Sequence, residues 1–164
     1  MKRVHLEEMF EHKGYKCACT FTKMGFRCGY VAVDNTHPWF GKDFSDDGPD
    51  EVECHWGLTY SGEGKHFYNE DDNLWWFGFD CGHCSDMPDY KQAKEYGLVN
   101  EQEYFLGKRY ESMLAFDDST VKDLEFVKEN CKLIVEQLHL IKKRGHWLWF
   151  TKRRKQLNRL FVSE

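Results

Sequence analysis

The stretch from Leu74 to Asp89, LWWFGFDCGHCSDMPD, constrains the fold of this chain more than any other segment. Its aromatic and apolar first half, which ends at Phe79, is followed by aspartate, cysteine and histidine side chains separated by small residues. Aromatic side chains at this density are typical of a buried β-strand. Gly82 and Ser85 allow the following backbone to turn tightly and to bring short polar side chains together. The segment therefore predicts a core strand with a polar site at its end.

Four further segments have the composition of β-strands. Apolar and polar side chains alternate near Val4 and again from Tyr15 to Thr22, with the turn sequence His-Lys-Gly between them, which predicts a hairpin. Residues 26–33 predict a third strand and residues 51–60 a fourth. The connections between these strands lack helical periodicity, so we expect a mainly antiparallel sheet of about five strands.

Two details of this sheet are also predicted. Gly29, inside the third strand, indicates either a β-bulge or a close approach of another segment to the backbone. The loop from Asp34 to Asp50 is rich in Asp, Gly, Pro and Ser. We expect it to be ordered, with Trp39 and Phe40 holding it to the body.

Helical signals dominate the second half of the chain. Asp89 is expected to cap a short helix that ends near Gly97, and a second helical piece follows Asn100. After the sequence DDST at 117–120, apolar residues recur every three or four positions. These residues are Val121, Leu124, Val127, Cys131, Ile134, Leu138 and Ile141. Such a stripe must cover an apolar surface, so we predict an α+β fold in which a long C-terminal helix covers the sheet, plus shorter helices.

Length and charge indicate one domain with a C-terminal extension. A chain of 164 residues is the size of about one domain, which we assign to residues 1–141 as a single α+β domain. Residues 142–164 contain aromatic side chains, eight basic side chains and one acidic side chain, and we expect a basic helical extension there. It is predicted to pack on the acidic body, or to bind nucleic acid or an acidic protein.

Hydropathy gives an expectation about location. The sequence has no apolar stretch long enough for a bilayer and no signal-peptide pattern, so we expect a cytoplasmic protein without a membrane partner. In that reducing compartment, the seven cysteines should be mainly free thiols.

Cysteine and histidine side chains could meet near the end of the predicted fifth strand. Cys81 and Cys84 form a C-x-x-C pair, and Cys54 and His55 lie in the predicted fourth strand. Four such groups can hold zinc in a tetrahedron. However, a structural zinc site usually has a second matching pair of ligands. Cys54 and His55 are neighbours in a predicted strand, so their side chains would point to opposite faces and could not both reach one metal ion. Zinc is therefore one alternative, and nothing in the sequence demands a cofactor.

In the other alternative, the cysteines are packing residues and polar side chains line a pocket in an aromatic frame. The residues of this predicted pocket are His55, Thr59, Tyr60, Asp80, His83 and Asp86. Such groups suit the binding of a polar ligand, or acid and base chemistry around a bound water or cation. Asp80, His83 and Asp86 could hold a divalent metal ion. A purely structural role, in which both aspartates cap turns, is also open.

A second polar group lies in the loop after the predicted third strand. Lys42 follows Gly41 and is close to His37, and Arg27 on the third strand could join them to bind an anion. Ordinary surface charge explains these residues equally well. The sequence contains no recognised nucleotide-binding, metalloprotease or esterase motif.

Several segments resemble a largely uncharacterised family of small bacteriophage and prophage proteins. Its members have a C-G-Y-V strand followed by H-P-x-x-G-K-D, H-G-G-L-T-Y-S and W-W-F-G-F-D-C-A-H-x-G-D. The matching segments here are residues 28–31, 37–43, 55–61 and 75–86, and residues 123–138 resemble the closing helix of the family. Trp56 stands where a Gly is usual, and Cys84 with Ser85 replaces a small residue and Gly. The C-x-x-C pair is therefore a departure from the family pattern.

The resemblance implies a small phage accessory product that acts in the host cytoplasm. Such products often bind or block host components, including the nucleotide messengers of antiviral signalling. We therefore predict binding of a small anionic or nucleotide-like ligand in the His/Asp/aromatic pocket, as a counter-defence sponge. One alternative is a metal-dependent hydrolase of a phosphoester-like bond with Asp80, His83 and Asp86 at the cation. Another is a protein inhibitor of a host enzyme.

Overall fold

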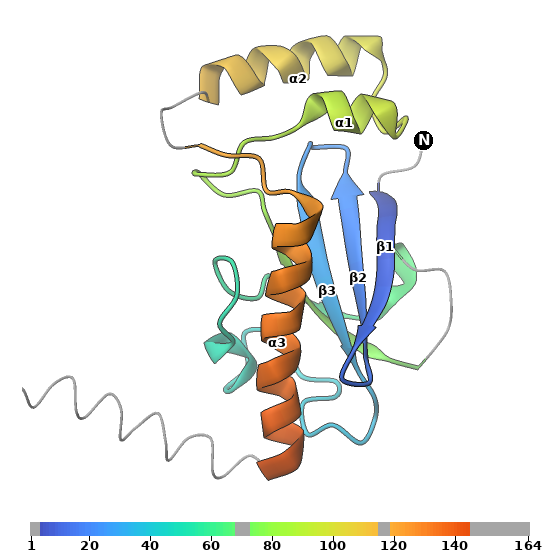
Figure 1. The fold of residues 1–164 in the computed structure, drawn as a ribbon, viewed down its shortest axis with the longest axis vertical. Coiled ribbons are helices and arrows are strands. Elements are labelled where there is room, and N and C mark those ends of the chain that lie inside the picture. Colours follow the sequence, from blue (N-terminus) through green and yellow to red (C-terminus); the bar gives the residue numbers. More distant parts are fainter. Residues whose placement is uncertain (1–3, 68–72, 115–118, 145–164) are drawn as a thin grey trace, which may run out of the picture.

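The computed structural model describes residues 4–67, 73–114 and 119–144. Within these residues the chain forms one sheet and three α-helices (Figure 1). The strands are β1 (Val4–His12), β2 (Tyr15–Thr22), β3 (Arg27–Val33), β4 (Tyr60–Gly62) and β5 (Trp75–Asp80), and the helices are α1 (Tyr90–Glu95), α2 (Glu101–Leu114) and α3 (Leu124–Arg144). The strand order is β1-β2-β3-β5-β4, and all four neighbouring pairs are antiparallel. The predicted α+β fold class is confirmed.

The predicted hairpin of β1 and β2 is present and contains an irregularity. Its two turn residues, Lys13 and Gly14, have positive φ angles of 48° and 81°, the left-handed conformation of the short turns that match the twist of a hairpin. In β1 the register shifts between Leu6 and Glu8, which leaves Glu7 as the extra residue of a β-bulge. A bulge re-aims a side chain, and the carboxylate of Glu7 is only 3% exposed.

Helix α3 lies across one face of the sheet (Figure 1). Five residues of its apolar stripe are completely or almost completely buried: Val127, Cys131, Ile134, Leu138 and Ile141. At Gly29 in β3, a Cβ atom would lie 2.4 Å from Phe79 and 2.8 Å from the Sγ of Cys131. Gly29 therefore marks a close approach of the helix to the sheet, the second of its two predicted roles.

The start of α3 differs from the prediction. The helix begins at Leu124, and the carboxylate of Asp123 caps it by accepting a hydrogen bond of 2.8 Å from the Phe126 amide. Thr120 instead pairs with Asp86 in a parallel bridge, and Val121 is 43% exposed. Residues 117 and 118 of the predicted cap lie outside the described residues.

The predicted fourth strand, residues 51–60, is wrong. Residues 54–57 form a turn, closed by a 3.1 Å hydrogen bond from the Gly57 amide to the Cys54 carbonyl, and only Tyr60–Gly62 pairs with β5. Trp56 and Gly57 have φ angles of 57° and 86°, which lie outside the β region of regular strands. The aromatic composition of this segment thus comes from an exposed turn residue, Trp56, and from Tyr60 in the short strand β4.

The other face of the sheet and its end have apolar clusters of their own. Tyr30, Phe67 and Trp76 belong to the cluster on the face opposite α3.

Helices α1 and α2 lie side by side beyond one end of the sheet (Figure 1). Asp89 caps α1 as predicted, by accepting a hydrogen bond from the Gln92 amide. Helix α2 follows Asn100, where a second helical piece was expected.

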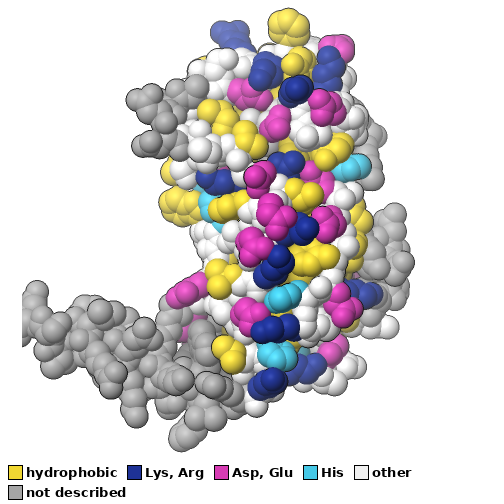
Figure 2. Space-filling model, in the orientation of Figure 1, with side chains coloured by type: hydrophobic (Ala, Val, Ile, Leu, Met, Phe, Trp, Pro, Cys, Tyr) yellow, Lys and Arg dark blue, Asp and Glu magenta, His cyan; other side chains and the backbone are white. Residues whose placement is uncertain are grey.

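The outer face of α3 is covered by charged side chains of both signs (Figure 2). Lys132 pairs with Glu129 one turn earlier, and Lys142 Nζ lies 2.8 Å from a carboxylate oxygen of Asp34 in the loop after β3. Exposed pairs of this kind contribute little to stability. The basic extension predicted from residue 142 begins as the last turn of α3, and residues 145–164 lie outside the described residues.

None of the described helices is both long enough and apolar enough to cross a bilayer.

The predicted loop from Asp34 to Asp50 is ordered. Trp39 is 1% exposed, as expected, whereas Phe40 is 39% exposed and lies against Trp75 with the two rings tilted by 52°. His37 is buried, and its Nε2 lies 3.1 Å from the carbonyl oxygen of Leu138 in α3. The loop is therefore tied to the helix by a histidine and to the core by a tryptophan.

Candidate functional site

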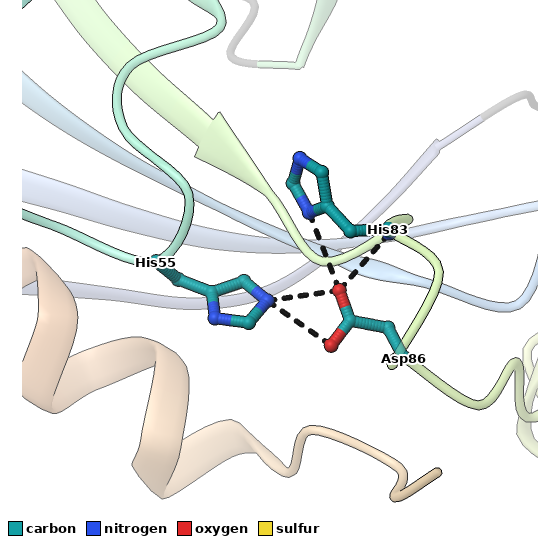
Figure 3. A group of neighbouring side chains, drawn as sticks. All are labelled: His55, His83 and Asp86. Carbon is teal, nitrogen blue, oxygen red and sulfur yellow. Dashed lines mark hydrogen bonds and ion pairs between the residues drawn. The ribbon is translucent and has the colours of Figure 1, made fainter.

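Three polar side chains meet beside the first turn of α3: His55, His83 and Asp86 (Figure 3). Nε2 of His55 lies 3.0 Å and 2.8 Å from the two carboxylate oxygens of Asp86. Nδ1 of His83 lies 3.3 Å from Oδ2 of the same carboxylate. One nitrogen of each imidazole and an oxygen of Asp86 lie within 4.8 Å of one another. Side chains from two distant segments therefore converge at Asp86.

The turn after β5 fixes the position of Asp86. The Asp86 amide donates to the His83 carbonyl at 2.9 Å, and the His83 amide donates to Oδ2 of Asp86 at 3.0 Å. The amide of Met87 donates to the carbonyl of Thr120 at 3.0 Å, which joins this turn to the segment that precedes α3. The main chain around Asp86 is thus held on both sides, and its carboxylate is held by the His83 amide.

Helix α3 fixes the position of His55. The His55 amide donates to the side-chain oxygen of Asn130 at 2.9 Å, and the imidazole meets the edge of the Phe126 ring at a centroid distance of 5.2 Å. These contacts orient the ring toward Asp86. His55 therefore lies in a turn and is held in place by α3, whereas the sequence predicted that a strand would hold it.

Asp86 is an ionised carboxylate held in a nearly buried position, with its side chain 1% exposed. Burial on its own would raise the pKa of Asp86. Hydrogen bonds from His55 and from the His83 amide, and the charge of Lys122, outweigh burial, so the pKa of the carboxyl lies below its usual value. Nζ of Lys122 lies 3.6 Å from Oδ1. The site is therefore a buried negative charge surrounded by donors.

Trp56 covers the imidazole of His83. The two rings stack with centroids 5.2 Å apart and planes inclined by 17°, and Trp56 is nevertheless 62% exposed. Its φ of 57° is uncommon for a bulky residue and natural for glycine. A strained, exposed aromatic ring next to a polar cluster is a feature typical of binding sites.

A cleft of about 910 Å³ opens from this cluster. His83 and Asp86 lie in its wall together with Cys84, and Lys23 and Glu103 add one charge of each sign. The remaining wall is mainly aromatic and aliphatic. Its apolar residues are Met24, Phe26, Tyr90, Val99, Leu106, Tyr110 and Leu114. The cleft thus has a polar end formed by the turn after β5 and an apolar side formed mainly by α1 and α2.

Asp80, which sequence reasoning placed in the pocket and at a metal ion, lies apart from the cluster. Alternate strand residues point to opposite faces, and Phe79 packs under α3, so Asp80 shares the opposite face with Trp76. Its two carboxylate oxygens accept hydrogen bonds from the Thr59 hydroxyl at 2.8 Å and the Gly82 amide at 2.9 Å. Asp80 therefore ends β5 and holds Thr59, the structural role that the sequence left open.

Tyr60 also lies away from His55. Its ring meets those of Tyr30 and Phe67 in the cluster on the face opposite α3, and its hydroxyl donates to the Glu63 carbonyl at 2.6 Å. The structure thus unites three of the six predicted pocket residues and assigns Thr59, Tyr60 and Asp80 to the other face.

The C-x-x-C pair is divided between core and surface. Cys81 is 1% exposed, and burial together with the charge of Asp86 raises the pKa of its thiol. Cys84 is exposed and lines the cleft. Among the described residues, no group of potential metal ligands includes a cysteine, and all seven cysteines are free thiols. This division of the pair between core and surface disfavours a zinc site built on the two cysteines.

Arg27 and Lys42 do not form a common anion site. Arg27 begins β3, and Lys42 lies in the loop beyond the opposite end of that strand. Arg27 instead forms a bidentate ion pair with Glu7, at 2.9 Å and 3.0 Å, and donates to the Lys122 carbonyl. The ammonium of Lys42 donates to the Asp47 carbonyl within its own loop. Both cations therefore have structural partners.

Sequence reasoning missed Lys122 and gave Trp56 no role at the site. Lys122 carries no local signal, because its contact with Asp86 depends on the pairing of Thr120 with the turn after β5. For Trp56 there was a signal in the departure from glycine. Glu7 was also missed, since a bulge cannot be read from the alternation of β1.

Comparison of the chain with protein-family models found no match, and comparison with curated proteins and with solved structures found no significant match. The resemblance to phage proteins stays a prediction, and the functional argument depends on the geometry of the site.

Proposed function

We propose that the protein binds a small nucleotide-like ligand in the cleft between α2 and the turn after β5. The observation that supports this most is the position of His83 and Asp86 at one end of a cleft whose other walls are largely apolar. Small-molecule sites combine an apolar cavity of several hundred Å³ with a few convergent polar groups, and the cleft has this composition and size.

The wall chemistry favours a ligand with a flat ring. Phe26, Tyr90 and Tyr110 offer aromatic surfaces, while the partly exposed imidazole of His83, which Asp86 orients, can bond to the edge of a heterocycle. Lys23 at the same cleft can pair with a phosphate, whereas Glu103 disfavours a ligand with many negative charges. These features support a nucleoside or mononucleotide in preference to a simple polyanion. In the phage setting that the resemblance implies, such binding would remove a messenger from solution.

Isothermal titration calorimetry with nucleosides, mononucleotides and cyclic dinucleotides tests the proposal. We expect saturable heat with at least one class and a Kd that rises at least tenfold in Asp86→Asn. Asp80→Asn, a matched change on the other face, should leave the Kd unchanged. The titrations are run in EDTA, so that they report on the cleft without added metal. Absence of heat with every ligand, or an equal effect of both variants, would contradict the proposal.

A second candidate function is hydrolysis of a phosphoester with a divalent cation. It is favoured by the cluster of two imidazoles and one carboxylate, of which His83 and Asp86 line the cleft, since metalloenzymes combine such ligands with an open position for water. Cleavage of bis-p-nitrophenyl phosphate with Zn²⁺ or Mn²⁺ tests this candidate. A rate that does not fall in Asp86→Asn would exclude these residues as the source of activity.

A further inference from the structure

We propose that Nε2 of His55, Nδ1 of His83 and a carboxylate oxygen of Asp86 bind a divalent transition metal ion of the zinc class. The ligand set differs from the one predicted from sequence, because His55 takes the place of Asp80. The proposal goes beyond ligand binding in the cleft, since the cluster can be loaded with metal alone.

The distances within the cluster fit a coordination shell. Bonds of about 2.0 to 2.1 Å from zinc to nitrogen or oxygen place tetrahedral ligands about 3.3 Å apart. The His55 nitrogen lies 2.8 Å and the His83 nitrogen 3.3 Å from Oδ2 of Asp86. The three ligand atoms lie within 4.8 Å of one another, so small side-chain rotations bring them to coordination distance (Figure 3).

The chemistry of the ligands selects the class of metal. Two imidazoles and one carboxylate suit Zn²⁺, Co²⁺ or Fe²⁺ better than Mg²⁺ or Ca²⁺, which prefer oxygen ligands. Three protein ligands leave one coordination position for a water molecule or a ligand atom. Because His83 and Asp86 also line the cleft, that position can face the proposed ligand.

The surroundings of the cluster hold its ligands in place. Asn130 fixes the backbone of His55, and the turn hydrogen bond from the His83 amide fixes the Asp86 carboxylate. Side-chain exposure rises from 1% at Asp86 to 12% at His55 and 23% at His83, which leaves an entry path from the surface. Such support of the ligands typically raises metal affinity.

Lys122 opposes metal binding. Its ammonium lies 3.6 Å from Oδ1 of Asp86 and supplies the positive charge that the metal would bring. Metal binding therefore requires this side chain to move away or the carboxylate to use its other oxygen. Removal of the charge should strengthen binding about five- to tenfold, because a cation near a metal site acts by Coulomb repulsion.

Titration of the full-length chain with Zn²⁺ and Co²⁺, after treatment with EDTA and its removal, tests the site. We expect one equivalent to bind, a visible Co²⁺ absorption band, and a change in the fluorescence of Trp56, which stacks on His83. Lys122→Met should bind more tightly than the unchanged chain. His83→Gln and Asp86→Asn should each lose this equivalent.

His139→Gln is the matched control, because His139 lies on α3 more than three turns beyond Phe126. It should keep the equivalent and the Co²⁺ band. Circular dichroism verifies that all variants are folded. If no metal binds below about 1 mM, or if the variants of His83 and Asp86 keep the full stoichiometry and band, the proposal is wrong. The titrations contain no nucleotide, so their failure would leave ligand binding in the cleft to be judged by its own experiment.

Discussion

Two buried clusters of charged groups lie on either side of the segment that leads into α3, and they differ in access. In the closed cluster, Glu7, Arg27 and Tyr96 satisfy one another: Glu7 accepts from the Arg27 guanidinium and from the Tyr96 hydroxyl, and both charged side chains are at most 9% exposed. In the open cluster, Asp86 is as deeply buried, but its partner His83 reaches a cleft.

The difference distinguishes a structural ion pair from a candidate site. The carboxylate of Glu7 has a bidentate partner and a hydroxyl donor, so a ligand would have to break these contacts. The His83 side chain is 23% exposed and lines the cleft, so a ligand can reach it without breaking a buried ion pair. Lys122 connects the two clusters, because its carbonyl accepts from Arg27 and its ammonium approaches Asp86.

Breaking the closed cluster should have the largest effect on stability. Arg27→Met leaves the buried Glu7 carboxylate without its partner, and we expect a loss of about 3 to 5 kcal/mol in the free energy of unfolding. Urea denaturation followed by circular dichroism measures it. Lys142→Met, which removes one partner of an exposed pair, is the control and should cost less than about 1 kcal/mol. Equal losses in the two variants would show that Arg27 is not part of a closed buried cluster.

Breaking the open cluster should affect binding more than folding. Asp86→Asn keeps the shape of the side chain and removes its charge, so we expect a loss of about 1 to 3 kcal/mol in the free energy of unfolding. The same variant should lose ligand heat in calorimetry. If Asp86→Asn destabilised the protein as much as Arg27→Met and left binding intact, the two clusters would have the same structural role.

Trp56 sharpens the comparison because it adds a strained backbone to the open cluster. None of the three residues of the closed cluster has a positive φ. Trp56→Gly and Trp56→Ala both remove the ring over His83, but only glycine adopts the left-handed conformation freely. We therefore expect the glycine variant to be more stable than the alanine variant by about 1 kcal/mol, measured by thermal and urea unfolding. A more stable alanine variant would mean that residue 56 does not keep this conformation in solution.

Thiol reactivity should report the same contrast between core and cleft. Iodoacetamide should first modify Cys84, which is exposed, while Cys81 reacts only on unfolding because burial raises the pKa of its thiol. Mass spectrometry of peptides from the native protein locates the adduct. A Cys84→Ser variant should show no early adduct at residues 54–84. Rapid labelling of Cys81 would indicate that the strand end is open.

The smallest expected effect concerns the exposed pair of Asp34 and Lys142. Hydrogen bonds from Lys142 and Thr36 lower the pKa of Asp34 to about 2. A carboxyl with a lowered pKa stabilises the fold above its ordinary pKa of about 3.9, and this contribution disappears as the pH falls through the folded value. Because the pair is solvent-exposed, we expect Asp34→Asn to cost only about 0.5 kcal/mol at pH 6. Urea denaturation should show no difference between the two proteins near pH 2, and a difference that grew toward pH 2 would contradict the assignment.

Local patterns predicted the parts of the fold that depend on neighbours in sequence. The hairpin follows from alternation on both sides of a Lys-Gly turn, and α3 follows from its apolar stripe. Residues 51–60 failed because an aromatic composition resembles that of a strand, while the backbone turns at Trp56 and Gly57. The left-handed backbone at these two residues outweighed the strand-like composition.

The candidate site, like the fold, was predictable only where it depends on residues that are close in sequence. His83 and Asp86 lie three residues apart in one turn, so the motif located them. Asp80 was misplaced because strand parity puts it on the face opposite Asp86. Lys122 comes to the cluster through a tertiary pairing that leaves no mark in the sequence.

The pairing of Asp86 with Thr120 has a topological consequence. The chain leaves the body after residue 86 and returns to the same point at residue 120, where the Met87 amide meets the Thr120 carbonyl at 3.0 Å. Helices α1 and α2 are therefore an excursion whose two ends are already joined. Exchange of this excursion would alter one wall of the cleft and remove Tyr96 from the closed cluster, while His55, His83 and Asp86 stay on the body. Ligand preference and the polar cluster could thus diverge independently among chains built on this scaffold.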